Sequence, residues 1–197
     1  MTKSLFTAFA ILSVASAHAF TVATFADPST VAESPLFTWD RTNNTLSGVW
    51  TASGLTLETP GLTGGGSVSN AHFVMDPVQL TPVINGQYYL MSRGSVRFFT
   101  NDINNPFLTI TFAGGSFLNP SNAGASSTVG NSVAFAGPNV GAGWSQETFS
   151  FSLTNAMTVG NITTFTSSFT SSAVPEPASM VILATGVAAL IARRRKA

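Results

Sequence analysis

The sequence predicts a mainly β protein whose folded domain is an antiparallel β-sandwich or a jelly roll. Three observations support this fold class. Apolar and hydroxyl side chains alternate with period two in several segments, which places the apolar groups on one sheet face. Only 8% of the 197 residues are charged, and Gly, Ser, Thr and Asn, which suit turns and strands, take their place. Turn signals recur between the alternating segments, as in all-β domains.

The amino-terminal segment has the three features of a secretory signal peptide. Lys3 supplies a positive charge, residues 5–15 form a short apolar run, and Ala17 and Ala19 occupy the small-residue positions of a cleavage site. A buried amino-terminal helix would account for the apolar run alone. We therefore predict a signal peptide over residues 1–19 and a mature chain that begins near Phe20.

Strands are predicted with most support where the alternation of apolar and hydroxyl side chains is unbroken. One segment places apolar side chains at Phe149, Phe151 and Leu153 with hydroxyls between them, and residues 108–112 and 55–58 alternate in the same way. We expect Phe149, Phe151 and Leu153 to face the interior. Further strand candidates are residues 37–39, 46–51, 71–75, 88–91 and 95–100.

Turn residues separate these segments. Residues 40–44 predict a hairpin that pairs Trp39 with Leu46, and Ser53-Gly54 predicts a two-residue turn between two further strands. No helix is expected between the two ends of the chain.

The predicted β domain covers residues 20–165. Residues 166–173 are almost all Ser, Thr and Phe, and we expect them to form a flexible spacer that lifts the domain off a membrane.

The carboxy-terminal segment predicts one short transmembrane helix. Residues 178–192 carry no charge, and these 15 residues would rise about 22 Å as a helix, against a bilayer core of about 30 Å. Four cations follow and should remain cytoplasmic, which leaves the β domain on the outer side of the membrane. An ordinary single-pass anchor without processing would also fit this pattern. The four cations are Arg193, Arg194, Arg195 and Lys196.

The segment 174–197 resembles the PEP-CTERM sorting signal of Gram-negative bacteria. Val174, Pro175, Glu176 and Pro177 precede the apolar run, and the cation cluster closes the chain. The resemblance implies that an exosortase, an integral-membrane protease-like enzyme, recognises the Pro-Glu-Pro motif and cuts near it. It also implies a chain held briefly in the inner membrane with a periplasmic domain, and then exported to the cell surface or beyond. Such proteins occur in species that make exopolysaccharide and biofilm.

Charge and cysteine content exclude several kinds of partner and site. Between the two end segments, three cations face seven carboxylates, which leaves a net charge of −4 and no basic patch for nucleic acid. The chain has no cysteine, so disulfides and thiolate sites are excluded. We expect no cofactor and no metal site.

Catalytic residues are not apparent in the sequence, and we expect a protein that is not an enzyme. His72 is the one histidine outside the signal peptide, and it lacks a nearby nucleophile motif. Glu33, Glu58 and Glu147 are candidates for a glycosidase carboxylate pair, but are more typical of solvated surface charges. Residues 101–105 offer oxygen ligands for calcium, although a turn is the favoured interpretation.

Two classes of function remain for the β domain. One is a structural or adhesive role at the surface, associated with exopolysaccharide or biofilm. The alternative is a carbohydrate-binding module, for which Trp39, Trp50 and Trp144 would form a ligand platform. Exposed aromatic rings would favour the second class and buried rings the first. A hydrolase, the third possibility, would need an acidic cleft.

Overall fold

The computed structural model describes residues 18–29, 35–84, 86–126 and 132–175. This part of the chain forms fourteen β-strands and no helix. No helix in it is long and apolar enough to cross a membrane, and the predicted transmembrane helix lies outside it. The strands are β1 (Phe20–Phe25), β2 (Phe37–Asp40), β3 (Thr45–Trp50), β4 (Leu57–Glu58), β5 (Ser67–Val68), β6 (His72–Ile84), β7 (Tyr88–Met91), β8 (Gly94–Phe99), β9 (Leu108–Phe112), β10 (Gly115–Leu118), β11 (Asn122–Ser126), β12 (Val133–Ala136), β13 (Trp144–Val159) and β14 (Ile162–Pro175).

Eight strands close into an antiparallel β-barrel. Their order around the ring is β6, β7, β10, β11, β13, β14, β2 and β3, and β3 pairs again with β6. Four hairpins connect neighbouring strands at one end of this ring: β2–β3, β6–β7, β10–β11 and β13–β14. A closed ring has no free edge, so the backbone groups of these strands are paired on both sides.

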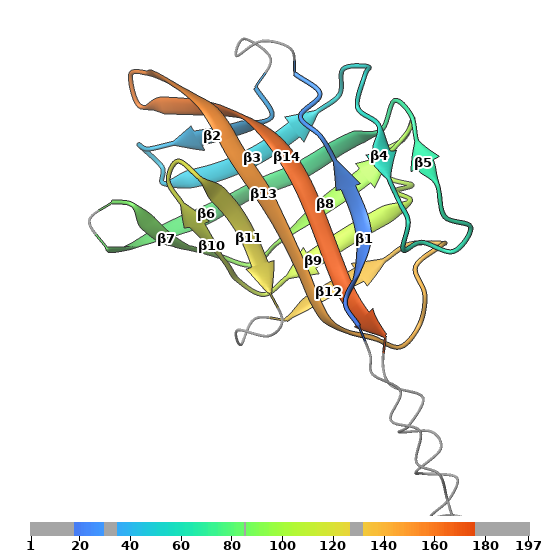
Figure 1. Cartoon of the computed structure of the whole chain (residues 1–197). Coiled ribbons are helices and arrows are strands. Elements are labelled where there is room, and N and C mark those ends of the chain that lie inside the picture. The colour runs from blue at the N-terminus through green and yellow to red at the C-terminus, as the bar shows by residue number, and fades with distance from the viewer. Residues whose placement is uncertain (1–17, 30–34, 85, 127–131, 176–197) are drawn as a thin grey trace, which may run out of the picture.

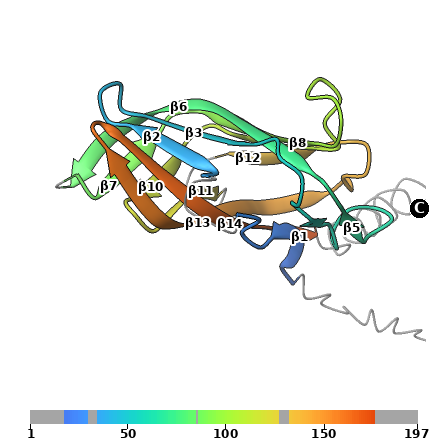
Figure 2. The same cartoon turned by 90° about the horizontal axis from the view of Figure 1, so that it is seen from above.

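The long strands β6 and β14 leave the ring and carry the remaining six strands. The first half of β6 pairs with β8, which continues to β9 and β12, whereas its second half pairs with β7. The second half of β14 pairs with β1, which continues to β4 and β5. Figure 2 shows β3, β6 and β8 on one side of the interior and β13, β14 and β1 on the other.

The mainly β prediction is therefore confirmed, but the structure has a barrel with extra strands in place of a sandwich or jelly roll. The difference arises because β6 and β14 change neighbours halfway along, which closes one half of the sheet and leaves the other half as two facing layers. Most predicted strands are present, and Trp39 pairs with Leu46 in the expected hairpin. The predicted hairpin at Ser53-Gly54 is wrong, because β3 pairs with β2 and β6 while β4 pairs with β1 and β5.

Aromatic rings fill the interior. Phe151 is fully buried, and its ring centroid lies 4.7 Å from that of Phe37 and 4.9 Å from that of Phe169. Nearer the end of the barrel that carries the four hairpins, the Trp39 ring packs edge-on against Tyr89, with 5.3 Å between the ring centroids. It packs against Phe117 at the same distance. The predicted inward positions Phe149, Phe151 and Leu153 are all buried, as the alternation requires.

The predicted spacer is instead a core strand. Residues 166–173 belong to β14, where Phe169 is 2% exposed and Ala173 is fully buried. The Ser- and Thr-rich composition is misleading because several of these hydroxyls are buried with partners. Ser171 accepts a hydrogen bond from the Ala23 amide at 3.1 Å and donates one to the Ala23 carbonyl at 2.9 Å, next to a register shift in β1. The β domain accordingly runs to Pro175 and not to residue 165.

Candidate functional site

The two ends of the folded domain lie side by side. β1 begins at Phe20, where the mature chain is predicted to start, and Phe20 is the register partner of Ala173 on β14. Figure 1 shows the start of β1 beside the end of β14. Pro175 is the last residue of β14, and the Ser145 hydroxyl donates a hydrogen bond to the Val174 carbonyl at 3.3 Å. Both predicted processing signals therefore connect to the domain at the same place.

Only part of each signal lies within the described residues. Ala19 is exposed immediately before β1, and Val174 and Pro175 form the end of β14. Six residues of the predicted tail site, together with the predicted signal-peptidase residue Ala17, lie outside the described residues: Glu176, Pro177, Arg193, Arg194, Arg195 and Lys196.

The three tryptophans do not form a common platform. Trp39 is 4% exposed and Trp50 is 8% exposed, so both rings are core side chains of the β2–β3 hairpin. Trp144 is partly buried and packs edge-on against Phe20 at 5.4 Å and Phe135 at 6.1 Å.

Strand register keeps Trp39 and Trp144 far apart. On β14, Trp39 pairs with Thr163 and Trp144 pairs with Pro175. The twelve residue steps from Thr163 to Pro175 span about 40 Å of extended strand. The sequence therefore placed Trp39 and Trp50 correctly around one hairpin, but the ligand platform that would combine all three rings is not present.

The candidate catalytic residues are also dispersed. Glu58 is exposed on β4 and Glu147 is half-buried on β13, and β14 and β1 lie between these strands. Three strand spacings are about 14 Å, more than the roughly 5–9.5 Å that separates a glycosidase carboxylate pair. His72 is half-buried, with its ring 5.5 Å from that of Phe99. Glu33 lies outside the described residues.

The acidic loops form turns. The Asp102 carboxylate accepts a hydrogen bond from the Asn104 amide at 2.9 Å, which confirms the predicted turn. Among the described residues, no three side chains of the metal-binding types gather. Asp40 closes the β2–β3 hairpin in a similar way. The Asn43 side-chain amide, which donates to its carboxylate at 2.7 Å, is the largest cause that lowers the pKa of Asp40, with further help from the amides of Thr42 and Asn43.

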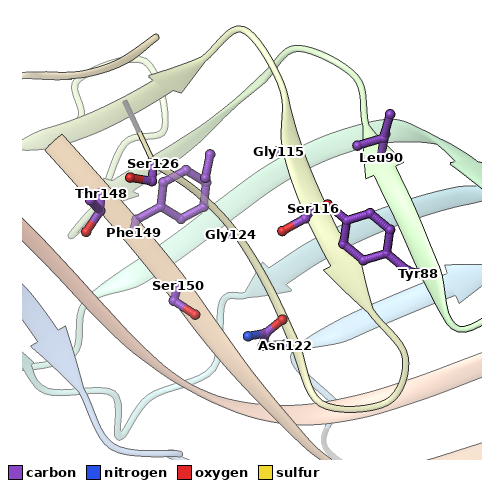
Figure 3. Close-up of a pocket in the computed structure, with 11 residues that line it drawn as sticks. Tyr88, Leu90, Gly115, Ser116, Asn122, Gly124, Ser126, Thr148, Phe149 and Ser150 are labelled. Carbon is purple, nitrogen blue, oxygen red and sulfur yellow. The ribbon is translucent and has the colours of Figure 1, made fainter. Parts of the chain in front are cut away.

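A shallow depression of about 570 Å³ lies on the outer wall of the barrel, over β7, β10, β11 and β13. This volume is within the usual range of ligand sites. Figure 3 shows side chains from all four strands around it. Its lining includes the side chains of Tyr88, Leu90, Ser116, Asn122, Thr148 and Ser150.

Glycine produces this depression. Gly124 stands in register between Ser116 and Ser150, and a Cβ added there would lie 2.3 Å from the Phe149 carbonyl oxygen. A Cβ on Gly115 would lie 2.6 Å from the Gly124 carbonyl oxygen. The strands approach so closely that no side chain fits, and the floor of the depression is consequently backbone.

The sequence predicted the outward hydroxyls of β13 from their alternation with Phe149 and Phe151. The sequence could not predict the depression, because β7, β10, β11 and β13 become neighbours only when the ring of strands closes. The glycines in short strands are the one local signal, since an isolated glycine in a strand often marks a close approach of backbone.

Comparison with known proteins assigns only the tail. No curated protein and no solved structure matches the chain. The PEP-CTERM protein-sorting motif matches residues 173–196, which include the last strand residues at Val174 and Pro175. The predicted resemblance is thus confirmed. The chain carries a PEP-CTERM protein-sorting motif that begins in the last residues of its β domain, which implies an exported, membrane- or surface-sorted protein that an exosortase processes.

Proposed function

We propose that this protein is a non-enzymatic structural or adhesive component of the cell surface or extracellular matrix, released from the inner membrane by cleavage at its tail. The proposal rests on the burial of large aromatic side chains, which leaves them unavailable to a ligand. Trp39, Trp50 and Tyr89 are buried in the core, and the exposed Glu58 and the half-buried Glu147 lie three strands apart in the sheet. A stable, weakly charged barrel attached to a sorting motif suits a matrix component, associated with exopolysaccharide or biofilm.

The tail acts in this proposal as a transient membrane anchor. The apolar run stops translocation, and the four terminal cations hold the end in the cytoplasm, because each costs about 2.5–3.5 kcal/mol at the centre of a membrane. Glu176 keeps the motif at the polar boundary. Pro175 and Pro177 favour extended backbone before them, which a protease can bind.

The fold limits the space that the exosortase has at the cleavage motif. Because β14 continues to Pro175, no spacer separates the domain from the motif. The exosortase would therefore cut directly beside the folded domain, or release the last residues of β14 from Ser145 as it binds. In either case, the released protein retains the complete barrel.

Mass spectrometry of the protein released from cells tests the proposal. The Glu176→Ala variant should remain in the membrane uncut, whereas the matched Glu58→Ala variant, altered at an exposed glutamate on β4, should be processed like the wild type. Released chains that still contain residues 180–196, or normal cleavage of Glu176→Ala, would contradict release by cleavage at the Pro-Glu-Pro motif. Hydrolysis of a polysaccharide by the purified protein would contradict the non-enzymatic role.

A further inference from the structure

We propose that the outer-wall depression binds an uncharged polysaccharide chain that lies across the strands. This inference deepens the proposed function, because it assigns the matrix contact to one face of the barrel. It differs from the tryptophan platform, because none of the three tryptophans lines the depression.

The lining is matched to a neutral ligand. None of the residues that line the depression is Asp, Glu, Lys, Arg or His. A phosphate, carboxylate or cation would lose its hydration there without gaining a counter-charge. The polar groups that the depression offers are hydroxyls and one amide, which both donate and accept hydrogen bonds, as sugar hydroxyls do.

Three of these polar side chains are available for a ligand. Ser116, Asn122 and Ser150 make no hydrogen bond through their side chains to any other described residue, whereas the Thr148 hydroxyl is paired with that of Ser172 at 3.0 Å. Ser116 and Ser150 are two strand spacings apart, about 9.5 Å, across the glycine floor. They can therefore contact opposite sides of a sugar ring that rests on the backbone of Gly124.

One wall of the depression is apolar. Tyr88 and Leu90 are outward residues two positions apart on β7, and the Leu90 side chain is 48% exposed. Figure 3 shows the Tyr88 ring next to Ser116 at the side of the depression. A pyranose ring has one face of C–H groups and a rim of hydroxyls, so an aromatic wall beside hydroxyl groups fits both parts.

The same chemistry continues beyond the depression, which favours a polymer over a single sugar. The register links Ser150 to Thr170 on β14, and Thr170 to Thr24 on β1. Thr24, Ser150 and Thr170 also line a second hollow of about 200 Å³. From Leu90 to Thr24 the row crosses six strands, or about 24 Å, without a charged side chain.

Calorimetric titration of the exported protein with hexasaccharides tests this assignment. The neutral probes are cellohexaose, xylohexaose, mannohexaose and maltohexaose, and hexagalacturonate is the anionic probe of equal length. At least one neutral probe should bind with a millimolar or lower Kd, and hexagalacturonate should not bind. Failure of all four neutral probes, or binding of the anionic probe alone, would overturn the assignment while leaving the export and cleavage of the protein unaffected.

Two variants test whether the hexasaccharides bind in the depression. Ser150→Gln places a longer side chain over the glycine floor, and Tyr88→Ala removes the aromatic wall; each should weaken binding at least about tenfold. The control is Ser95→Gln on β8, an outward serine on the opposite layer, which should bind like the wild type. Thermal unfolding checks that all three variants are folded.

If Ser150→Gln and Tyr88→Ala, both folded, bind as well as the control, the site lies elsewhere and the inference is wrong. Sedimentation velocity tests the remaining alternative, which is that two copies of the chain associate through this face. Self-association that Ser150→Gln abolishes, in a protein that binds no probe, would identify the face as a contact between copies of the chain.

Discussion

Replacement of Phe169 by alanine separates the two interpretations of the segment before the sorting motif. In a flexible spacer the change would cost nothing. In the structure, Phe169 is 2% exposed, and its ring lies 4.9 Å from Phe151, 5.1 Å from Phe98 and 5.5 Å from Phe25. Truncation of a buried phenylalanine costs about 3–5 kcal/mol, so we expect a loss in this range.

Urea unfolding of the exported protein, followed by tryptophan fluorescence, measures this cost. With a slope of about 1.5 kcal/mol per molar urea, the midpoint should fall by about 2–3 M. Phe135→Ala is the matched control, because Phe135 is only partly buried on the edge strand β12 and should lose much less. A loss below about 1 kcal/mol for Phe169→Ala, with an unchanged slope, would refute the assignment of β14 to the core.

Three further predictions concern the amino terminus, the wall of the barrel and the β2–β3 hairpin. Amino-terminal sequencing of the exported protein should give a chain that starts near Phe20; material that retains Lys3 would contradict the signal peptide. Gly124→Ala should destabilise the barrel by about 1–3 kcal/mol in urea unfolding, because its Cβ would lie 2.3 Å from the Phe149 carbonyl oxygen; an unchanged midpoint would contradict the close approach of β11 and β13. The lowered pKa of Asp40 means that its carboxylate stabilises the hairpin above the ordinary value of 3.8, and that this contribution is lost as the pH falls through the lower folded-state value. Asp40→Asn should therefore reduce the urea midpoint at about pH 6 and leave it nearly unchanged at about pH 2; equal effects at both pH values would contradict a role for the charge.

Local alternation predicted the interior faces of the strands well. Phe149, Phe151 and Leu153 are buried because successive side chains of a strand point to opposite faces, and this rule needs no knowledge of the neighbouring strands. The hairpin between Trp39 and Leu46 was equally predictable, since its turn residues stand between two short apolar segments.

The same reasoning failed where hydroxyls are buried. Thr166, Ser167 and Ser171 are almost fully buried, so composition indicated a spacer where the structure has a strand. Their hydrogen bonds explain how this is tolerated: the Thr166 hydroxyl lies 3.0 Å from that of Thr154 and accepts from the Asn155 amide at 2.9 Å. Thr154 and Asn155 belong to β13, and composition alone does not reveal which strand supplies such partners.

The sequence by itself determined that the protein carries a PEP-CTERM sorting motif, because such a motif is read as a short linear segment whose charge and hydropathy act locally. It also determined the β class, through a period that each strand carries within itself. Only the tertiary structure decided that the sheet closes, that Trp39 and Trp50 are core residues, and that Ser116 and Ser150 face each other across Gly124. These features depend on pairings between distant segments, such as β2 with β14, and pairing is set by the packing of the whole interior rather than by any local pattern.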